Sequence, residues 1–259
     1  MKLFIFEGRN PEDEIFRSME RLFPSSPEER IIQTFDCNIY SLYDRMKSLD
    51  GYGDVVNVMK ELYRKRDDNP FTEGMDSSSF SEIFLFFDYD LHHPNNLTFE
   101  EKDSEIEELL SFFSDETDNG KLYISYPMAE AIWHTKELED PCFSSYCVPI
   151  DKCHSFKRLA AEFNGYKNHF FICFNEQHGG NNEEVLRNNW LLLIKQHVSK
   201  VRFIRHDEDY APPSLKIVIS QLELFTAIRT KYVSAKGLIP ILSAFPIYLY
   251  DNYKDIVLG

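Results

Sequence analysis

Two short apolar runs stop abruptly at carboxylates: Leu3-Phe4-Ile5-Phe6-Glu7-Gly8 and Ile83-Phe84-Leu85-Phe86-Phe87-Asp88-Tyr89-Asp90. Apolar runs of this length are typical of strands that are buried on both faces of a parallel sheet. In open α/β sheets, ligands bind just beyond the carboxyl ends of the strands. If the two strands are parallel neighbours, Glu7, Asp88 and Asp90 meet at one edge of the sheet and concentrate negative charge there.

This group of carboxylates predicts a cation site, because a cation relieves the repulsion between neighbouring negative charges. Oxygen ligands with no cysteine nearby favour Mg²⁺ or Mn²⁺ over zinc. Asp88 and Asp90 would hold one or two ions and lower the pKa of a bound water, while Glu7 would act as general base or as a further ligand. The alternative for Asp88 and Asp90 is capping of the loop at a strand end, a common role of aspartate.

The composition indicates a folded, acidic protein. Its 259 residues can form one large domain or two small ones, and 43% hydrophobic with 15% aromatic residues exclude global disorder. The net charge of −15, from 28 basic against 43 acidic residues, argues against tight unassisted binding to DNA or RNA. The same charge suits a protein partner with a basic surface.

The targeting signals and cysteines indicate a cytoplasmic protein with no membrane partner. No apolar run approaches the roughly 18 residues of a membrane span, and no basic region precedes the first apolar run. Five cysteines, an odd number, fit a reducing compartment better than a disulfide framework. Cys142, Cys147 and Cys153 are spaced too loosely for a usual zinc site, so ordinary buried thiols are expected there.

Strand and helix signals alternate in the first half of the chain. Further strands are expected at 31–35 and 122–126, and helices at 15–23, at 39–66 with an interruption at 50–53, and at 106–113. This alternation predicts an α/β fold with a parallel sheet and helices on both faces. Beyond about residue 140 the pattern is mainly helical (159–163, 185–198, 215–232), 169–174 fits a strand or a buried helix, and 245–250 is assigned to the core.

The order of these motifs resembles the Toprim domain, in which one strand ends in Glu-Gly and a later strand ends in Asp-x-Asp. Topoisomerases, primases, OLD-family nucleases and several phage-defence effectors share this domain. In addition, Tyr126-Pro127-Met128-Ala129-Glu130 is similar to the Asn-Pro-x-x-Glu segment of RloB-like defence Toprim proteins. The resemblance therefore implies a Toprim-like catalytic domain at 1–135, with Glu130 as a fourth acid, and a mainly helical extension at 136–259 packed on it.

The resemblance implies a metal-dependent endonuclease, because stand-alone small Toprim proteins are mostly nucleases that work beside an ABC-type or AAA ATPase. The nearest analogue is the toxic effector of PARIS-type anti-phage defence systems. We therefore expect Glu7, Asp88, Asp90 and Glu130 to bind Mg²⁺ or Mn²⁺ for the hydrolysis of phosphodiesters in tRNA, other RNA or DNA. The competing hypothesis is a non-catalytic Toprim-fold regulatory or interaction subunit of an ATPase complex, and a homodimeric active form is left open.

Several other polar residues have two interpretations. Glu130 either completes a second metal position or is a solvated helix residue. Glu14 would fit that metal position as well, although compensation of the helix dipole explains it better. His92 and His93 follow the acidic pair, where they would contact a phosphate or leaving group, or would simply be surface histidines of a loop.

Overall fold

The computed structural model describes residues 1–22, 30–48, 53–164, 169–172, 183–206 and 217–253. Its contacts divide the chain into two units. The first consists of Met1–Arg9 with Ser26–Tyr123, and the second of Asn10–Ser25 with Ile124–Gly259. The domain boundary predicted at residue 135 stays a prediction, because compactness alone does not show which part folds or functions by itself.

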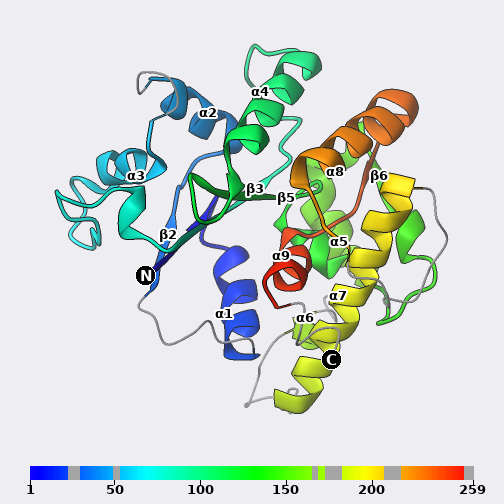
Figure 1. The fold of residues 1–259 in the computed structure, drawn as a ribbon. Helices are drawn as coiled ribbons and strands as arrows, with labels where there is room; N and C mark the ends of the chain where they lie inside the picture. The colour runs from blue at the N-terminus through cyan, green and yellow to red at the C-terminus, as the bar shows by residue number, and fades with distance from the viewer. Residues whose placement is uncertain (23–29, 49–52, 165–168, 173–182, 207–216, 254–259) are drawn as a thin grey trace. The chain divides into compact units, whose positions relative to one another are not determined.

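The first unit is built on a mostly parallel sheet of five strands in the order β2-β1-β3-β5-β4 (Figure 1). The strands are β1 (Lys2–Phe6), β2 (Arg30–Thr34), β3 (Glu82–Asp88), β4 (Ser114–Asp115) and β5 (Gly120–Ser125). β1 pairs in parallel with both β2 and β3, whereas the short β4 is antiparallel to β5. The predicted α/β class and the predicted strands are confirmed, and β4 is an addition that no pattern indicated.

The two central strands, β1 and β3, have apolar interiors that are buried, and their polar residues stand at the strand ends. In β1, residues 3–6 are at most 1% exposed, and in β3 residues 83–87 are at most 2% exposed. Across the pair, Phe4 stacks on Phe84 and Phe6 packs on Phe86, each with ring centroids 5.2 Å apart. The register aligns Phe6 with Phe86, so the residues that follow each strand emerge at the same edge.

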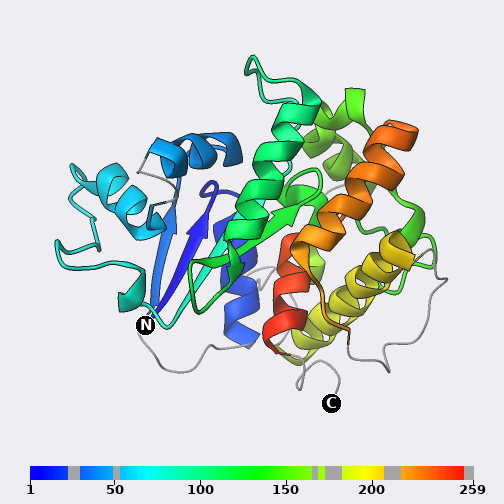
Figure 2. The same cartoon turned by 45° about the horizontal axis from the view of Figure 1, so that its top comes forward.

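Three helices of the first unit flank its sheet: α2 (Ile39–Ser48), α3 (Val55–Tyr63) and α4 (Phe99–Phe112). α2 packs against α4, and the two lie side by side in Figure 2. The start of α3 is fixed by Asp54, whose side chain accepts from the amide of Val56, and α4 begins with a capping box formed by Thr98 and Glu101. α2 ends at Ser48 and α3 begins at Val55, whereas 50–52, most of the predicted interruption, lie outside the described residues.

The second unit is mainly helical, as expected. Its helices are α1 (Glu12–Leu22), α5 (Phe156–Asn164), α6 (His169–Ile172), α7 (Glu183–His206), α8 (Gln221–Ile228, continued by a π-helical turn at Arg229–Ser234) and α9 (Ala244–Asn252). Shorter 3₁₀ segments cover Ala129–Trp133, Phe143–Ser145 and Ile150–Ser155, and β6 (Cys147–Pro149) pairs antiparallel with β7 (Leu238–Pro240). The helical alternative is correct for 169–172, while 173 and 174 lie outside the described residues.

The core of the second unit joins segments far apart in sequence. Trp190 on α7 is fully buried, and its indole N–H donates to the Ser18 hydroxyl of α1 at 3.0 Å. All residues from 244 to 250 in α9 are buried, which confirms their assignment to the core. In the parts of the chain that the structure describes, no helix is long and apolar enough to cross a membrane.

Candidate functional site

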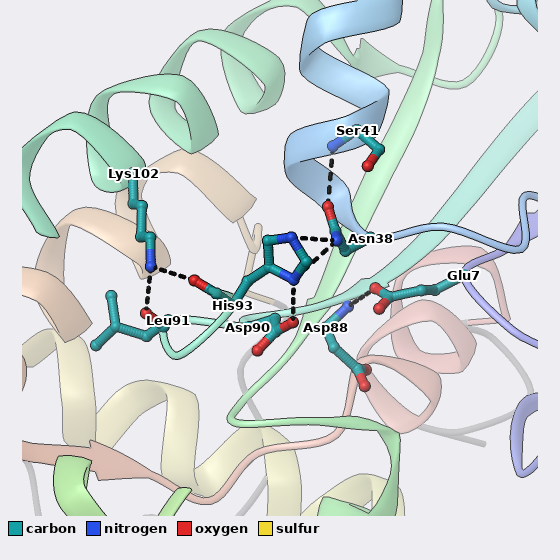
Figure 3. Close-up of polar contacts among 8 residues, drawn as sticks. All are labelled: Glu7, Asn38, Ser41, Asp88, Asp90, Leu91, His93 and Lys102. Atoms are coloured by element: carbon teal, nitrogen blue, oxygen red, sulfur yellow. Dashed lines mark hydrogen bonds and ion pairs between the residues drawn. The ribbon is translucent and has the colours of Figure 1, made fainter. Parts of the chain in front are cut away.

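Glu7 and Asp88 meet where β1 and β3 end. The amide of Glu7 donates to the carbonyl of Phe86 at 3.0 Å, which continues the ladder one residue past β1. The Glu7 carboxylate then accepts a hydrogen bond from the backbone amide of Asp88, the last residue of β3, at 2.8 Å (Figure 3). The two residues therefore lie on adjacent parallel strands at the carboxyl edge of one sheet, as the apolar runs predicted.

The strand order gives this edge a particular position. β1 is followed in the chain by β2 on one side, while β3 lies on its other side and β5 lies beyond β3. The connection after β1 leads to β2, and the connection after β3 leads to β4 and β5. The two connections therefore run in opposite directions across the sheet. In open α/β sheets, ligands bind at such a switch point, outside the carboxyl ends of the strands.

Asp90 follows in a tight turn and not in the strand itself. The amide of Leu91 donates to the carbonyl of Tyr89 at 2.9 Å, and the amide of His93 donates to the carbonyl of Asp90 at 3.1 Å. The Asp90 carboxylate is 38% exposed and lies 3.6 Å from Nδ1 of His93. Of the two histidines after the acidic pair, His93 therefore faces the acid, whereas the ring of His92 packs edge-on to Phe99.

The ring of His93 is held by the start of α2. Nδ2 of Asn38 lies 3.0 Å from Nδ1 and 3.1 Å from Nε2 of His93 (Figure 3). Asn38 is itself fixed, because its Oδ1 accepts from the amide of Ser41 in the first turn of α2 at 2.9 Å. The ring also stacks on Tyr40, with centroids 6.1 Å apart. Because both ring nitrogens lie within hydrogen-bond distance of the same Asn38 amide, Asn38 and Tyr40 together fix the position of the ring.

Lys102 on α4 is buried and forms hydrogen bonds with the backbone of the same turn. It is 4% exposed, and its Nζ donates to the carbonyls of Leu91 at 2.9 Å and His93 at 2.8 Å. Burial lowers the pKa of Lys102, and the nearby Asp90 carboxylate partly offsets this effect. The position of the turn that carries Asp90 and His93 is therefore set by a buried ammonium group.

The electrostatic potential here is negative. The pKa of the Tyr40 phenol is raised, first by burial and then by the carboxylates of Asp90, Asp103, Glu105 and Glu7. On α4, burial and the neighbouring acids raise the pKa of Glu105 to about 7. A cation or a protonated group is the chemistry that such a potential favours.

Glu130 belongs to the second unit, in the segment Ala129–Trp133. It is 4% exposed, and its carboxylate pairs with the ammonium of Lys157 at 2.9 Å. The interpretation of Glu130 as a solvated helix residue is therefore wrong, and its assignment to the metal site stays a prediction. Glu14 lies with Glu12 and Asp13 in the first turn of α1, as compensation of the helix dipole requires.

Carboxylates suit Mg²⁺ in kind, because this ion prefers oxygen ligands and commonly keeps several waters beside one or two carboxylates. Among the described residues, however, no three His, Cys, Asp or Glu side chains gather closely enough to form a metal site. The roles of Glu7, Asp88 and Asp90 as ligands or catalysts thus stay predictions. Of the three grouped cysteines only Cys153 is a buried thiol, with its pKa raised to about 12 by burial, while Cys142 is exposed.

Sequence reasoning missed Asn38, Tyr40 and Lys102, which surround the acidic turn. Asn38 carried one usable signal, since asparagine directly before a helical pattern is a common N-cap. Lys102 carried none, because a lysine in an acidic amphipathic helix is normally solvent-exposed. Comparisons of this chain with protein-family models, with curated proteins and with solved structures found no match.

Proposed function

We propose that this chain is a Toprim-like, Mg²⁺-dependent nuclease whose reaction takes place at the edge formed by Glu7, Asp88 and Asp90. One observation carries the proposal: the carboxylate of Glu7 and the amide of Asp88 are joined at 2.8 Å, at the switch point of the sheet. The motif order that resembles Toprim proteins supports the same function. Glu130 is retained in the proposal as a fourth acid.

The arrangement of residues suits phosphodiester hydrolysis. Bound Mg²⁺ would polarise the phosphate and lower the pKa of a bound water. Asp88 and Asp90 would hold the ion, and Glu7, already orientated by the Asp88 amide, would act as base or as a further ligand. His93 lies 3.6 Å from Asp90 with a ring held by Asn38, so it would position or protonate an oxygen of the substrate.

The proposed biological role is that of a toxic effector in anti-phage defence, controlled by an ABC-type or AAA ATPase. The net charge of −15 opposes a polyanionic substrate, so tRNA, other RNA or DNA would be cut efficiently only with the partner bound. A basic surface on the ATPase would bind the acidic chain, and salt would weaken this complex by screening.

The experiment is a cleavage assay of the purified chain with separate tRNA and plasmid DNA pools. Reactions contain Mg²⁺, Mn²⁺ or EDTA, with and without the product of the neighbouring gene. We expect metal-dependent cleavage of one pool, lost in Asp88→Asn and kept in Asp67→Asn, which changes an exposed acid of the same unit. Absence of cleavage in every combination, with the chain folded, would reject the nuclease.

A second candidate, a non-catalytic interaction subunit of an ATPase complex, rests on a specific observation. The Glu7 carboxylate already accepts a backbone hydrogen bond, as a purely structural residue at a strand end would. In that case the ATPase would still bind the chain and Asp88→Asn would leave its activity unchanged. ATP turnover and cleavage measured together, with the parent chain and with Asp88→Asn, separate the two candidates. Loss of cleavage in Asp88→Asn at unchanged ATP turnover supports the nuclease, whereas a change in ATP turnover with either chain, without cleavage by either, supports the interaction subunit.

A further inference from the structure

The second unit contains a cavity of about 350 Å³ between residues 139–144 and helix α7. From α7 it is lined by Leu192, Lys195, Gln196 and Ser199, at the spacing i, i+3, i+4, i+7 that places side chains on one helix face. Small-molecule sites commonly have volumes of about 300–1,000 Å³. None of the lining residues belongs to the acidic edge of the sheet, so a ligand in this cavity would contact a different set of residues.

The wall opposite α7 is held in place by buried polar groups. Asp140 is buried, its carboxylate accepts from the Tyr146 hydroxyl at 2.7 Å, and its amide donates to Oε1 of Gln196 at 3.2 Å. Lys200, which is 1% exposed, donates from Nζ to the carbonyls of Phe143 and Tyr146. These hydrogen bonds fix the segment at a distance from the face of α7, so the cavity is formed before any ligand binds.

The polar groups of the lining that remain available are mainly donors. Gln196 is 5% exposed, and its Nε2 is buried without a hydrogen-bond partner. Within the described residues, the Lys195 ammonium and the hydroxyls of Ser144 and Ser199 also have no polar partner. A buried donor without a partner costs about 1–3 kcal/mol, so this arrangement favours a ligand that supplies acceptors.

The apolar and acidic residues of the lining indicate which other chemical groups the ligand would carry. Phe143, 1% exposed, and Leu192 provide apolar surface. The Asp140 carboxylate is occupied by hydrogen bonds within its own segment, to Tyr146 and to the amide of Cys142 at 2.8 Å. Glu139 is exposed, and Lys195 is the basic residue among those that line the cavity.

We propose that this cavity binds a small organic anion. A carboxylate or phosphate group of the ligand accepts hydrogen bonds from Lys195 and Ser199, and an apolar or aromatic portion packs on Phe143 and Leu192. The carboxylate and phosphate classes share this chemistry, and both fit a cavity of this size. The proposal is independent of nuclease activity, because it concerns a different set of residues.

The test uses three probes with one ring: benzoate, phenyl phosphate and the neutral benzamide. Each is titrated into the full-length chain, and binding is followed by calorimetry and ligand-observed NMR. We expect saturable binding of one or both acids and at least about tenfold weaker binding of benzamide, because charge-assisted hydrogen bonds are the stronger ones. The preferred acid shows whether the natural ligand is a carboxylate or a phosphate.

Three variants locate the binding. Lys195→Met should weaken the preferred acid about tenfold or more, and Ser199→Trp should abolish binding by filling the cavity while circular dichroism shows a folded chain. Lys136→Met, which removes an exposed charge outside the cavity, should bind like the parent. The proposal is overturned if neither acid binds saturably up to about 10 mM, if folded Ser199→Trp still binds, or if Lys136→Met weakens binding as much as Lys195→Met.

Discussion

The hydroxyl of Tyr89 donates a hydrogen bond to the carboxylate of Asp103 at 2.8 Å, and both residues are buried. Tyr89 separates Asp88 from Asp90, so this contact ties the acidic turn to helix α4 at its centre. Asp88 and Asp90 therefore flank Tyr89, whose side chain is buried in the core. The precision of the candidate site therefore depends on residues that do not themselves face a ligand.

The first prediction is that Tyr89→Phe destabilises the chain by about 1–2 kcal/mol, because the Asp103 carboxylate loses a buried donor. Urea unfolding at neutral pH measures the change. Tyr40→Phe is the matched control, since the Tyr40 hydroxyl is buried without a hydrogen-bond partner among the described residues. Removal of that hydroxyl should be neutral or stabilising, and equal losses in the two variants would contradict the assigned contact.

The second prediction concerns Glu105, whose pKa is raised from 4.5 to about 7 by burial and then by Asp44, Glu101 and Glu108. Because the folded chain holds this proton more tightly than the unfolded chain, its ionisation weakens the fold as the pH rises from about 4.5 through 7. Glu105→Gln should therefore raise the free energy of unfolding at pH 8 by about 1 kcal/mol, and should change it little at pH 4.5.

Unfolding at the two pH values measures this effect, with Glu100→Gln as the control, since it replaces an exposed acid of the same helix. If Glu105→Gln instead destabilised the chain at pH 8, the charged form of Glu105 would be the favourable one and the assigned direction would be wrong.

The third prediction concerns Gly120, the first residue of β5, which has a φ of +115°. A Cβ added there would lie 2.9 Å from Cδ1 of Leu85 and 3.1 Å from Cγ2 of Ile83, both in the central strand β3. Gly120→Ala should destabilise the chain by about 2 kcal/mol or more through backbone strain and overpacking.

Thermal unfolding measures this loss. Gly74→Ala is the control, because a Cβ at Gly74 would meet nothing within 4 Å. A Gly120→Ala chain as stable as the parent would show that the turn before β5 adopts another backbone conformation.

The central strands and their acidic ends were predictable from sequence for one reason. A strand buried on both faces is apolar at every position, so the polar residue that ends it stands out, as Glu7 and Asp88 do. The pairing of the two strands was a hypothesis drawn from the two apolar runs that end in carboxylates, and the structure confirms it. The contacts that build the turn after Asp88 were not predictable, because Lys102 and Asn38 act through tertiary packing that leaves no periodic signal.

The environment of Glu130 could not be predicted from the sequence. It was singled out by a resemblance, and its sequence neighbourhood alone did not distinguish a metal ligand from a solvated residue. The structure shows a buried carboxylate that pairs with Lys157. Glu130 and Lys157 are 27 positions apart in the sequence, so no local sequence pattern could predict their ion pair.

The last prediction separates a metal site from a structural cap at the edge of the sheet. The hydrogen bond between Glu7 and Asp88 uses the backbone amide of Asp88, so it survives in Asp88→Ala. If the acids form a metal site, loss of one carboxylate relieves repulsion, and Asp88→Ala should melt at the same temperature as the metal-free parent or higher. Mg²⁺ should raise the melting temperature of the parent and not that of the variant.

Glu7→Gln should keep the shape of the edge, because the amide oxygen of glutamine can still accept from the Asp88 amide. It should fold like the parent, bind Mg²⁺ less tightly and fail to cut nucleic acid, whereas Glu7→Ala should also lose stability, by about 1 kcal/mol. Melting curves with EDTA and with Mg²⁺, together with the cleavage assay, measure all three variants. A metal-free Asp88→Ala that melts many degrees lower, beside a parent unaffected by Mg²⁺, would identify the acidic pair as a structural cap and reject the nuclease.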